Sequence, residues 1–169
     1  MVCFRRLCVA IGVTAAITVF AAPAWSQSHV TYSLAGVETA ATSTRGTFVG
    51  VALAGDDFGR WGAVIQHDPL NSPSPLVTGG GFAINGQVRD LQGFITAGTI
   101  RRLGGSCRQE TFAVTGGVLL VDGFGVPNGG SGAFGVKLTH YGFGLPGGGC
   151  FTFFATVEGL TTLALPSAP

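Results

Sequence analysis

The side chains that could take part in acid–base or ligand chemistry gather at the ends of three predicted strands. Two histidines are the most informative, because His67 and His140 each end a segment of alternating apolar residues. Imidazole titrates near neutral pH and ligates metals, so two imidazoles beside a carboxylate and guanidinium groups suit acid–base work, anion binding or metal ligation. The candidate binding rim comprises His67, Asp68, Arg101, Arg102, His140 and Tyr141, with His67 and His140 as the candidate catalytic pair.

Other features restrict what this rim could do. A two-histidine metal site needs a third ligand, and Asp68 is the only close candidate, so we predict no metal and no cofactor. The sequence has no G-x-S-x-G elbow, no H-E-x-x-H motif and no P-loop, so the usual signatures of three enzyme classes are missing. An alternative interpretation stays open, in which both histidines are strand-end residues that hydrogen-bond loop carbonyls.

The two histidines belong to similar segments. Residues 59–67 and 132–140 align with three identical positions, two glycines and the final histidine. In a strand, side chains alternate between the two faces, so His67 shares a face with Trp61, Ala63 and Ile65. The same alternation places His140 on a face with Phe134, Val136 and Leu138. We expect both faces to point inward and both to end in an imidazole.

The chain that must position these residues has the pattern of an all-β protein. Short alternating or β-branched segments are bounded by Gly, Pro, Asn and Asp, and no segment after residue 26 has helical periodicity with caps. The expected strands cover residues 30–38, 46–54, 59–67, 80–87, 91–102, 107–121, 131–141 and 150–163. Mostly short connections favour an antiparallel up-and-down barrel of about eight strands, with a two-sheet β-sandwich as the alternative.

Strand direction predicts where the rim lies. In an up-and-down order the third, fifth and seventh strands run the same way, so the six rim residues meet at one end of the fold. Two longer connections, residues 68–78 and 142–149, belong to that end as well. The dense glycines, 29 of 169 residues, are interpreted as sites of strand coiling or close backbone approach.

The N-terminal segment has the pattern of a signal peptide. Arg5 and Arg6 precede an uncharged apolar run over residues 7–22, and small residues follow it. Cleavage after Ala24 or after Ser26 fits this pattern, and we take residues 1–26 as the signal peptide, expected as a helix, and 27–169 as one β domain. The run is too short to serve as a comfortable membrane anchor. The mature protein is therefore expected to be secreted or periplasmic.

Charge and cysteine content bound the mature chain further. Loss of Arg5 and Arg6 leaves seven basic residues against eight acidic ones, a net charge of −1, so nucleic acid is an unsuitable partner. Cys3 and Cys8 leave with the signal peptide, and two cysteines in an oxidising compartment predict a Cys107–Cys150 disulfide. Strands two apart in a sheet lie about 9.6 Å from each other, so this bond requires bent strand starts or loops.

Several segments resemble known proteins. The segments at residues 46–52, 108–116 and 138–141 resemble those of a group of small exported bacterial β proteins of unassigned function. This resemblance implies a fold and no chemistry. More remotely, the size, leader and strand count resemble the allene oxide cyclase and dirigent barrels. That resemblance implies an oligomer that holds an apolar ligand inside, but no diagnostic motif matches and no catalytic residue carries over.

Three functional hypotheses follow. The first is a non-enzymatic exported β-barrel module that binds a small apolar ligand or a surface partner through one rim. The second is a cyclase- or isomerase-type barrel enzyme that uses His67 and His140. The third is a small outer-membrane barrel, which scarce tyrosine and the absence of an aromatic girdle disfavour.

Overall fold

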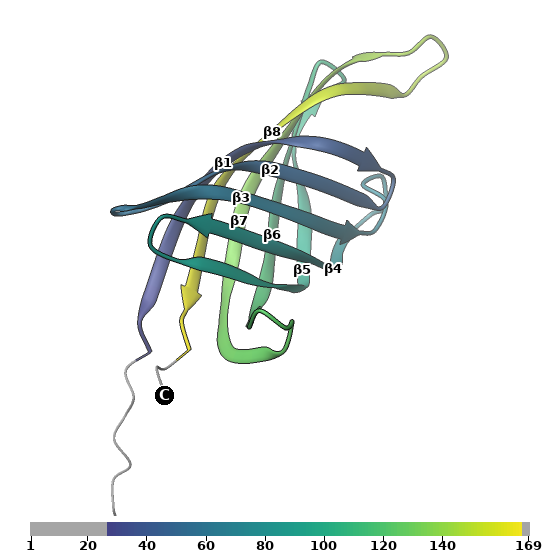
Figure 1. The fold of residues 1–169 in the computed structure, drawn as a ribbon. Helices are drawn as coiled ribbons and strands as arrows, with labels where there is room; N and C mark the ends of the chain where they lie inside the picture. The colour runs from purple at the N-terminus through teal and green to yellow at the C-terminus, as the bar shows by residue number, and fades with distance from the viewer. Residues whose placement is uncertain (1–26, 167–169) are drawn as a thin grey trace, which may run out of the picture.

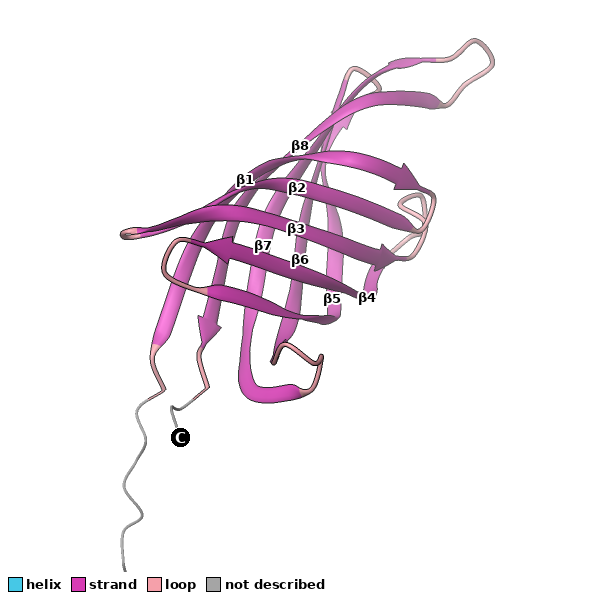
Figure 2. Ribbon diagram, in the orientation of Figure 1, coloured by secondary structure: helices cyan, strands magenta, loops and turns pink. Residues whose placement is uncertain are grey.

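The computed structural model describes residues 27–166, and in that range the chain forms strands joined by turns, with no helix (Figure 2). The predicted signal peptide, residues 1–26, lies outside the described residues. No helix suited to crossing a membrane occurs between residues 27 and 166. The strands are β1 (His29–Thr42), β2 (Arg45–Ala54), β3 (Asp57–His67), β4 (Leu76–Gly86), β5 (Asp90–Ser106), β6 (Gln109–Val121), β7 (Pro127–Gly144) and β8 (Cys150–Ala164).

The eight strands form one closed antiparallel barrel in sequence order. Each strand pairs with the next, and β1 pairs with both β2 and β8, which closes the sheet. In Figure 1, β2, β3 and β4 sweep across the front while β5, β6 and β7 run steeply behind them. The predicted up-and-down barrel is confirmed, and the two-sheet alternative is wrong, because the β1–β8 pairing leaves no free edge.

Side-chain alternation explains why these segments form a barrel wall. In β3, Trp61, Ala63 and Ile65 are buried, whereas Arg60 and Gln66 on the other face are exposed. The corresponding face of β7 is buried in the same way. The inward faces meet in a single apolar core, and burial of this area is the main favourable term for folding.

The observed strands are longer than predicted at the end of the barrel that holds the histidines. β1 continues past Glu38 to Thr42 after an irregularity in its pairing with β2. Leu76 pairs with Thr99, although the prolines before it suggested a long loop. Residues 142–144 pair with β8, although their glycines suggested a turn. Pairing with a neighbouring strand decides where a strand ends, and the local amino-acid composition does not reveal that pairing.

The predicted Cys107–Cys150 disulfide is confirmed. Cys150 begins β8 as expected, but Cys107 lies in the turn between β5 and β6 and does not begin β6. The turn bends over the intervening strand β7, where the Gly142 N–H donates a hydrogen bond to the Arg108 carbonyl, and the two cysteine Cα atoms lie 5.1 Å apart. The bond is compatible with an oxidising compartment. The β7–β8 hairpin projects beyond the barrel beside the β5–β6 hairpin (Figure 1).

Candidate functional site

The barrel encloses an apolar space, which we call the central cavity. The space open to the centre of a water-sized sphere is about 50 Å³. Its wall is made of inward-facing side chains from all eight strands, and Thr161 of β8 is the only hydroxyl among them. The largest contributors are Trp61, Phe48, Phe82, Phe134, Ile65 and Leu138.

Two glycines allow the Trp61 ring to lie close to the backbone of the barrel wall. Its Nε1–H donates a hydrogen bond of 3.2 Å to the Ala35 carbonyl, so the polar atom of the indole is satisfied by the barrel backbone. Gly36 of β1 and Gly50 of β2 pair with each other, and a methyl group on either would come within about 3.0 Å of the indole ring. The missing side chains let the ring lie on the strands and present an apolar surface to the cavity.

A second space, the histidine cavity, adjoins the central cavity at the barrel end where β3 and β7 finish. Its volume on the same measure is about 40 Å³. His67 and His140 both line it, as the alternation in the two similar segments predicted. Two further polar residues that were not predicted, Glu38 and the exposed Thr42, belong to the same lining.

The tautomer of His67 follows from its contact with the following residue. Its Nδ1 lies 2.7 Å from the Asp68 carbonyl oxygen, which can only accept a hydrogen bond. Nδ1 must therefore carry the proton, and in the neutral ring Nε2 is left as an acceptor. The predicted hydrogen bond from a strand-end histidine to a loop carbonyl is present here, and it leaves the other nitrogen free for chemistry.

His140 and Glu38 approach each other across strand β8. Their closest atoms, Nε2 of His140 and Oε2 of Glu38, are 3.5 Å apart, and the side chains are only 13% and 8% exposed. Val37 pairs with Thr156 and His140 pairs with Ala155, so the small Ala155 lies between the two long side chains. The His140 Nε2 is buried and has no hydrogen-bond partner among the described residues. The pair is thus a close polar contact that lacks a satisfied hydrogen bond.

The other rim residues share this end of the barrel without lining the histidine cavity. The Asp68 carboxylate accepts a hydrogen bond of 3.1 Å from the Leu76 N–H and so orders the β3–β4 connection. Arg101 is exposed, and Arg102 forms an ion pair with Glu110. Tyr141 packs against Phe154 with ring centroids 5.9 Å apart. Within residues 27–166, no three His, Cys, Asp or Glu side chains are arranged to hold a metal ion.

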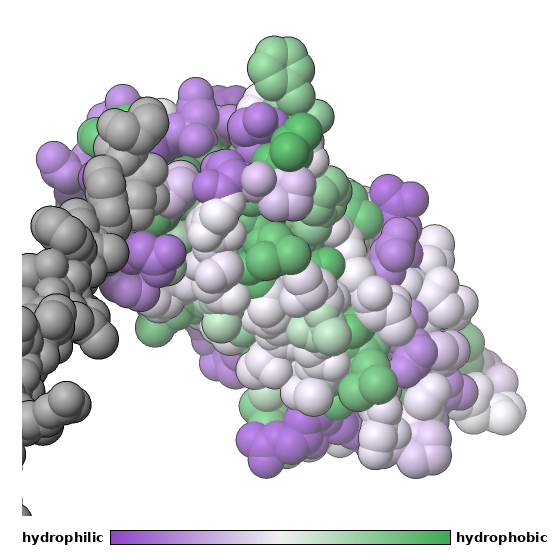
Figure 3. All heavy atoms as spheres, turned by 90° about the horizontal axis from the view of Figure 1, so that it is seen from below, coloured by the Kyte–Doolittle hydropathy of each residue, from purple (hydrophilic) through white to green (hydrophobic). Residues whose placement is uncertain are grey.

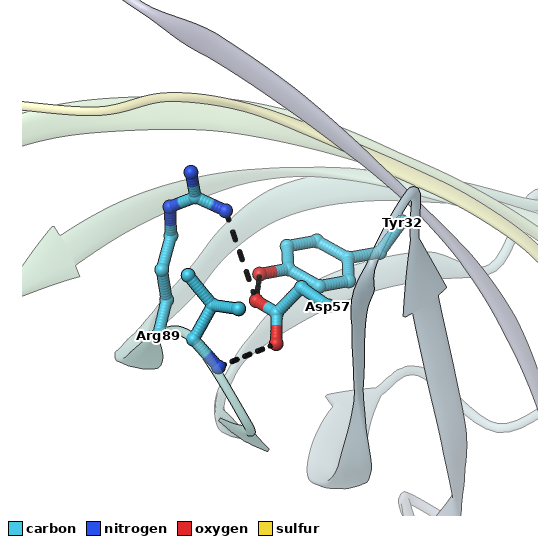
Figure 4. A network of polar contacts seen from close by, with 4 residues as sticks. Tyr32, Asp57 and Arg89 are labelled. Carbon is cyan, nitrogen blue, oxygen red and sulfur yellow. Dashed lines mark hydrogen bonds and ion pairs between the residues drawn. The ribbon is translucent and has the colours of Figure 1, made fainter.

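The opposite end of the barrel holds a buried polar network (Figure 4). The Tyr32 hydroxyl donates a hydrogen bond of 2.6 Å to Asp57, which also accepts one of 3.0 Å from the Val88 N–H. Arg89 lies 3.8 Å from the same carboxylate. Tyr32 and Asp57 are both fully buried, so the network ties β1, β3 and the β4–β5 turn together.

The network shifts the titration of both buried groups. Burial, followed by the hydrogen bond to Asp57, raises the pKa of Tyr32 to about 12. The hydrogen bond from Tyr32, followed by that from the Val88 N–H, lowers the pKa of the Asp57 carboxyl below its usual range. Tyr32 thus stays protonated and Asp57 ionised at neutral pH, which suits a structural anchor and leaves no group ready to exchange a proton.

Asp57 makes the stability of the barrel depend on pH. Because its pKa is lower in the folded state, its contribution is fully present above the pKa of the unfolded chain and is lost as pH falls through the folded pKa. We expect Asp57→Asn to lower the free energy of unfolding at pH 7 and to flatten its decline in acid, measured by urea unfolding across the acidic range. The control is Asp56→Asn, because Asp56 is the preceding residue and its side chain is exposed. An equal acid dependence in Asp57→Asn and the wild type would contradict this role.

The outer surface is also rich in apolar side chains. Figure 3 shows hydrophobic and neutral residues in the middle of the face seen from below, with the most hydrophilic atoms towards its edges. On β2, Val49, Val51 and Leu53 are exposed in alternation with the inward residues. Charged residues interrupt the wall elsewhere, as where Lys137 and Glu158 form an ion pair between β7 and β8. The outer wall thus carries both apolar and charged side chains, whereas the lining of the central cavity is almost entirely apolar.

Fold and site together define a closed eight-stranded antiparallel β-barrel with an apolar interior and a histidine-lined cavity at one end. Comparison with profiles of protein families, with curated proteins and with solved structures finds no match. The two resemblances described above stay predictions.

Proposed function

We propose that this protein is an exported, non-enzymatic barrel that binds a small apolar molecule in its central cavity. The observation that supports this most is the lining of that cavity, which is apolar apart from one threonine hydroxyl. Binding sites for small molecules are concave and mostly apolar, with a few polar groups that fix orientation. The central cavity supplies the apolar part, and the histidine cavity supplies polar groups beside it.

The size of the cavity restricts the ligand. The centres of water-sized spheres can occupy about 50 Å³ of the cavity. That space holds roughly three to five water molecules, which fill about 90–150 Å³ in the liquid. Water there would lack hydrogen-bond partners, whereas an apolar cavity of that order accepts benzene. We therefore propose a ligand of about the size of one ring.

The other two hypotheses have weaker support. A transmembrane barrel has a polar interior and an apolar outer band, whereas here the interior is apolar and Arg60, Lys137 and Glu158 are exposed on the wall. An enzyme would use His67, His140 and Glu38, but the arrangement of these three side chains does not indicate which atom of a substrate would react. A surface partner, a second copy of this chain included, would find exposed aromatic residues on the projecting β7–β8 hairpin.

Export is part of the same proposal. The disulfide and the signal-peptide pattern of residues 1–26 both favour a secreted or periplasmic protein. A carrier outside the cytoplasm would shield a poorly soluble molecule from water.

Filling the cavity should weaken binding strongly. Trp61 is the only tryptophan of residues 27–169, the expected mature chain, so in that chain its fluorescence reports directly on the cavity. We expect toluene to change Trp61 fluorescence saturably in the wild type and to bind at least about tenfold more weakly to Ala63→Leu, because the added carbons occupy its space.

The matched control is Ala133→Leu, which adds the same carbons to an exposed position of β7 and should bind toluene as the wild type does. Thermal unfolding of both variants verifies that each is folded. Absence of saturable toluene binding to the wild type, or equal binding to both variants, would contradict the proposal.

A further inference from the structure

We infer that the ligand of the central cavity carries a hydrogen-bond-donating head group, a hydroxyl or a protonated amine, which Glu38 and His67 receive in the histidine cavity. This inference rests on the proposed function and adds the polar chemistry of the ligand.

The two cavities are neighbours inside one barrel. They share four lining residues, Phe48, Ile65, Val114 and Leu138, so the same apolar side chains border both spaces. Within the central cavity the Thr161 hydroxyl already donates a hydrogen bond to the Ala133 carbonyl. A molecule whose apolar body occupies the central cavity therefore finds its other polar partners in the histidine cavity. At the other end, the carboxylate of Asp57 already accepts hydrogen bonds from Tyr32 and Val88.

The polar groups of the histidine cavity are mostly acceptors. The Nε2 of His67 is an acceptor in the neutral ring, because Nδ1 donates to the Asp68 carbonyl. A carboxylate offers two acceptor oxygens, and among residues 27–166 the one contact of the Glu38 oxygens with a donor-type group is the 3.5 Å approach to His140. The Thr42 hydroxyl of the same lining already donates to the Arg45 carbonyl. Acceptors in excess of donors favour a head group that donates.

Burial raises the cost of leaving a polar group of the histidine cavity without a hydrogen bond. The Glu38 side chain is 8% exposed, and the neighbouring His140 Nε2 is buried with no hydrogen-bond partner among the described residues. A buried polar group without a hydrogen bond loses free energy relative to water. Gly46 lies directly beside the Oε1 of Glu38, since a methyl group on Gly46 would lie 2.7 Å from that oxygen and 2.7 Å from the Phe48 ring. A donor that enters the histidine cavity gains a hydrogen bond to the carboxylate, whereas a carboxylate head would add a second negative charge.

His140 adds orientation to this receptor. Its ring packs against Phe112 with centroids 5.4 Å apart, which holds Nε2 towards Glu38. A hydroxyl between the two could donate to the carboxylate and accept from a protonated Nε2, whereas an ammonium could only donate. The two head groups thus make the same bond to Glu38 and differ at His140.

A series of four compounds with one ring tests the inference: toluene, benzyl alcohol, benzylamine and benzoate. We expect benzyl alcohol, benzylamine or both to bind about tenfold or more tightly than toluene, as one added hydrogen bond to a charged group predicts, and benzoate to bind more weakly than toluene. Titration of Trp61 fluorescence and calorimetry measure the four affinities.

Two variants of Glu38 separate the contributions. Glu38→Met keeps the length of the side chain and removes both acceptor oxygens, so it should erase the advantage of alcohol and amine over toluene. Glu38→Gln keeps an acceptor and removes the charge, so it should reduce amine binding more than alcohol binding. Glu158→Met, on the outer wall, is the control and should leave all four affinities as in the wild type.

The outcomes separate this inference from the proposed function. If toluene binds as tightly as the alcohol and the amine, the head-group preference is overturned while apolar binding stands. If benzoate binds most tightly, the preference is overturned as well, because the receptor would then be cationic. If none of the four compounds binds, the proposed function itself fails.

Discussion

Gly50→Ala is expected to lower the free energy of unfolding by about 3 kcal/mol, the upper range for overpacking of a well-packed interior. A methyl group at this position would lie 2.0 Å from the Ala35 carbonyl oxygen and 2.7 Å from Nε1 of Trp61. The first contact is with backbone of the paired strand β1, which cannot move without loosening the β1–β2 ladder. The second displaces the indole from its hydrogen bond to the same carbonyl.

Both effects have a direct measurement. Urea unfolding gives the loss of stability, and the emission spectrum of Trp61 reports the displaced ring in the folded state. We expect toluene affinity to fall as well, because the ring forms part of the cavity wall.

Gly62→Ala is the matched control, one strand away. A methyl group there would meet only the Phe48 carbonyl at 3.6 Å, an ordinary contact. Replacement of an unstrained glycine stabilises a protein by about 0.4–1 kcal/mol through the unfolded chain, so this variant should be as stable as the wild type or more so. Equal destabilisation by the two substitutions would show that close approach at Gly50 is not the cause.

Removal of the disulfide is the second change with a large expected effect. The double variant Cys107→Ser, Cys150→Ser should lose about 4 kcal/mol, because the cross-link closes a loop across 43 positions and restricts the unfolded chain. Small domains have a margin of about 5–15 kcal/mol, so the variant would retain only part of it. Urea unfolding of the oxidised wild type and the double variant measures the difference.

Reduction supplies the control for this prediction. A thiol reductant should lower the stability of the wild type to about that of the double variant and should leave the double variant unchanged. Mass spectrometry after alkylation identifies the bond in the exported chain. Two thiols that react without reduction would contradict the bond, and a double variant as stable as the oxidised wild type would contradict its contribution.

Much of this barrel could be predicted from the sequence because a strand has a local period of two residues. Trp61, Ala63 and Ile65 had to share a face whatever the strand paired with, and the structure buries that face. Short connections favoured neighbouring antiparallel strands, so the common end of β3, β5 and β7 was also predictable. The same alternation could have found Glu38, since Tyr32, Leu34 and Gly36 precede it at every second position of one strand.

The ends of the strands were less predictable. Prolines before Leu76 and glycines after Tyr141 predicted loops, yet both regions include paired strand. The placement of Cys107 in a turn was equally hidden, because the bend that brings it over β7 depends on contacts between hairpins.

The sequence by itself determined the class of the fold, the inward apolar faces and the pairing of the two mature cysteines, because alternation and cysteine count are properties of the chain. Only the tertiary structure decided that Glu38 meets His140 and that Arg101 and Arg102 turn away from the histidine cavity. Glu38 and His140 belong to strands joined through a third, β8, and their contact depends on the register of both pairings and on the small Ala155 between them. Closure of the barrel sets those registers, and no local pattern encodes them.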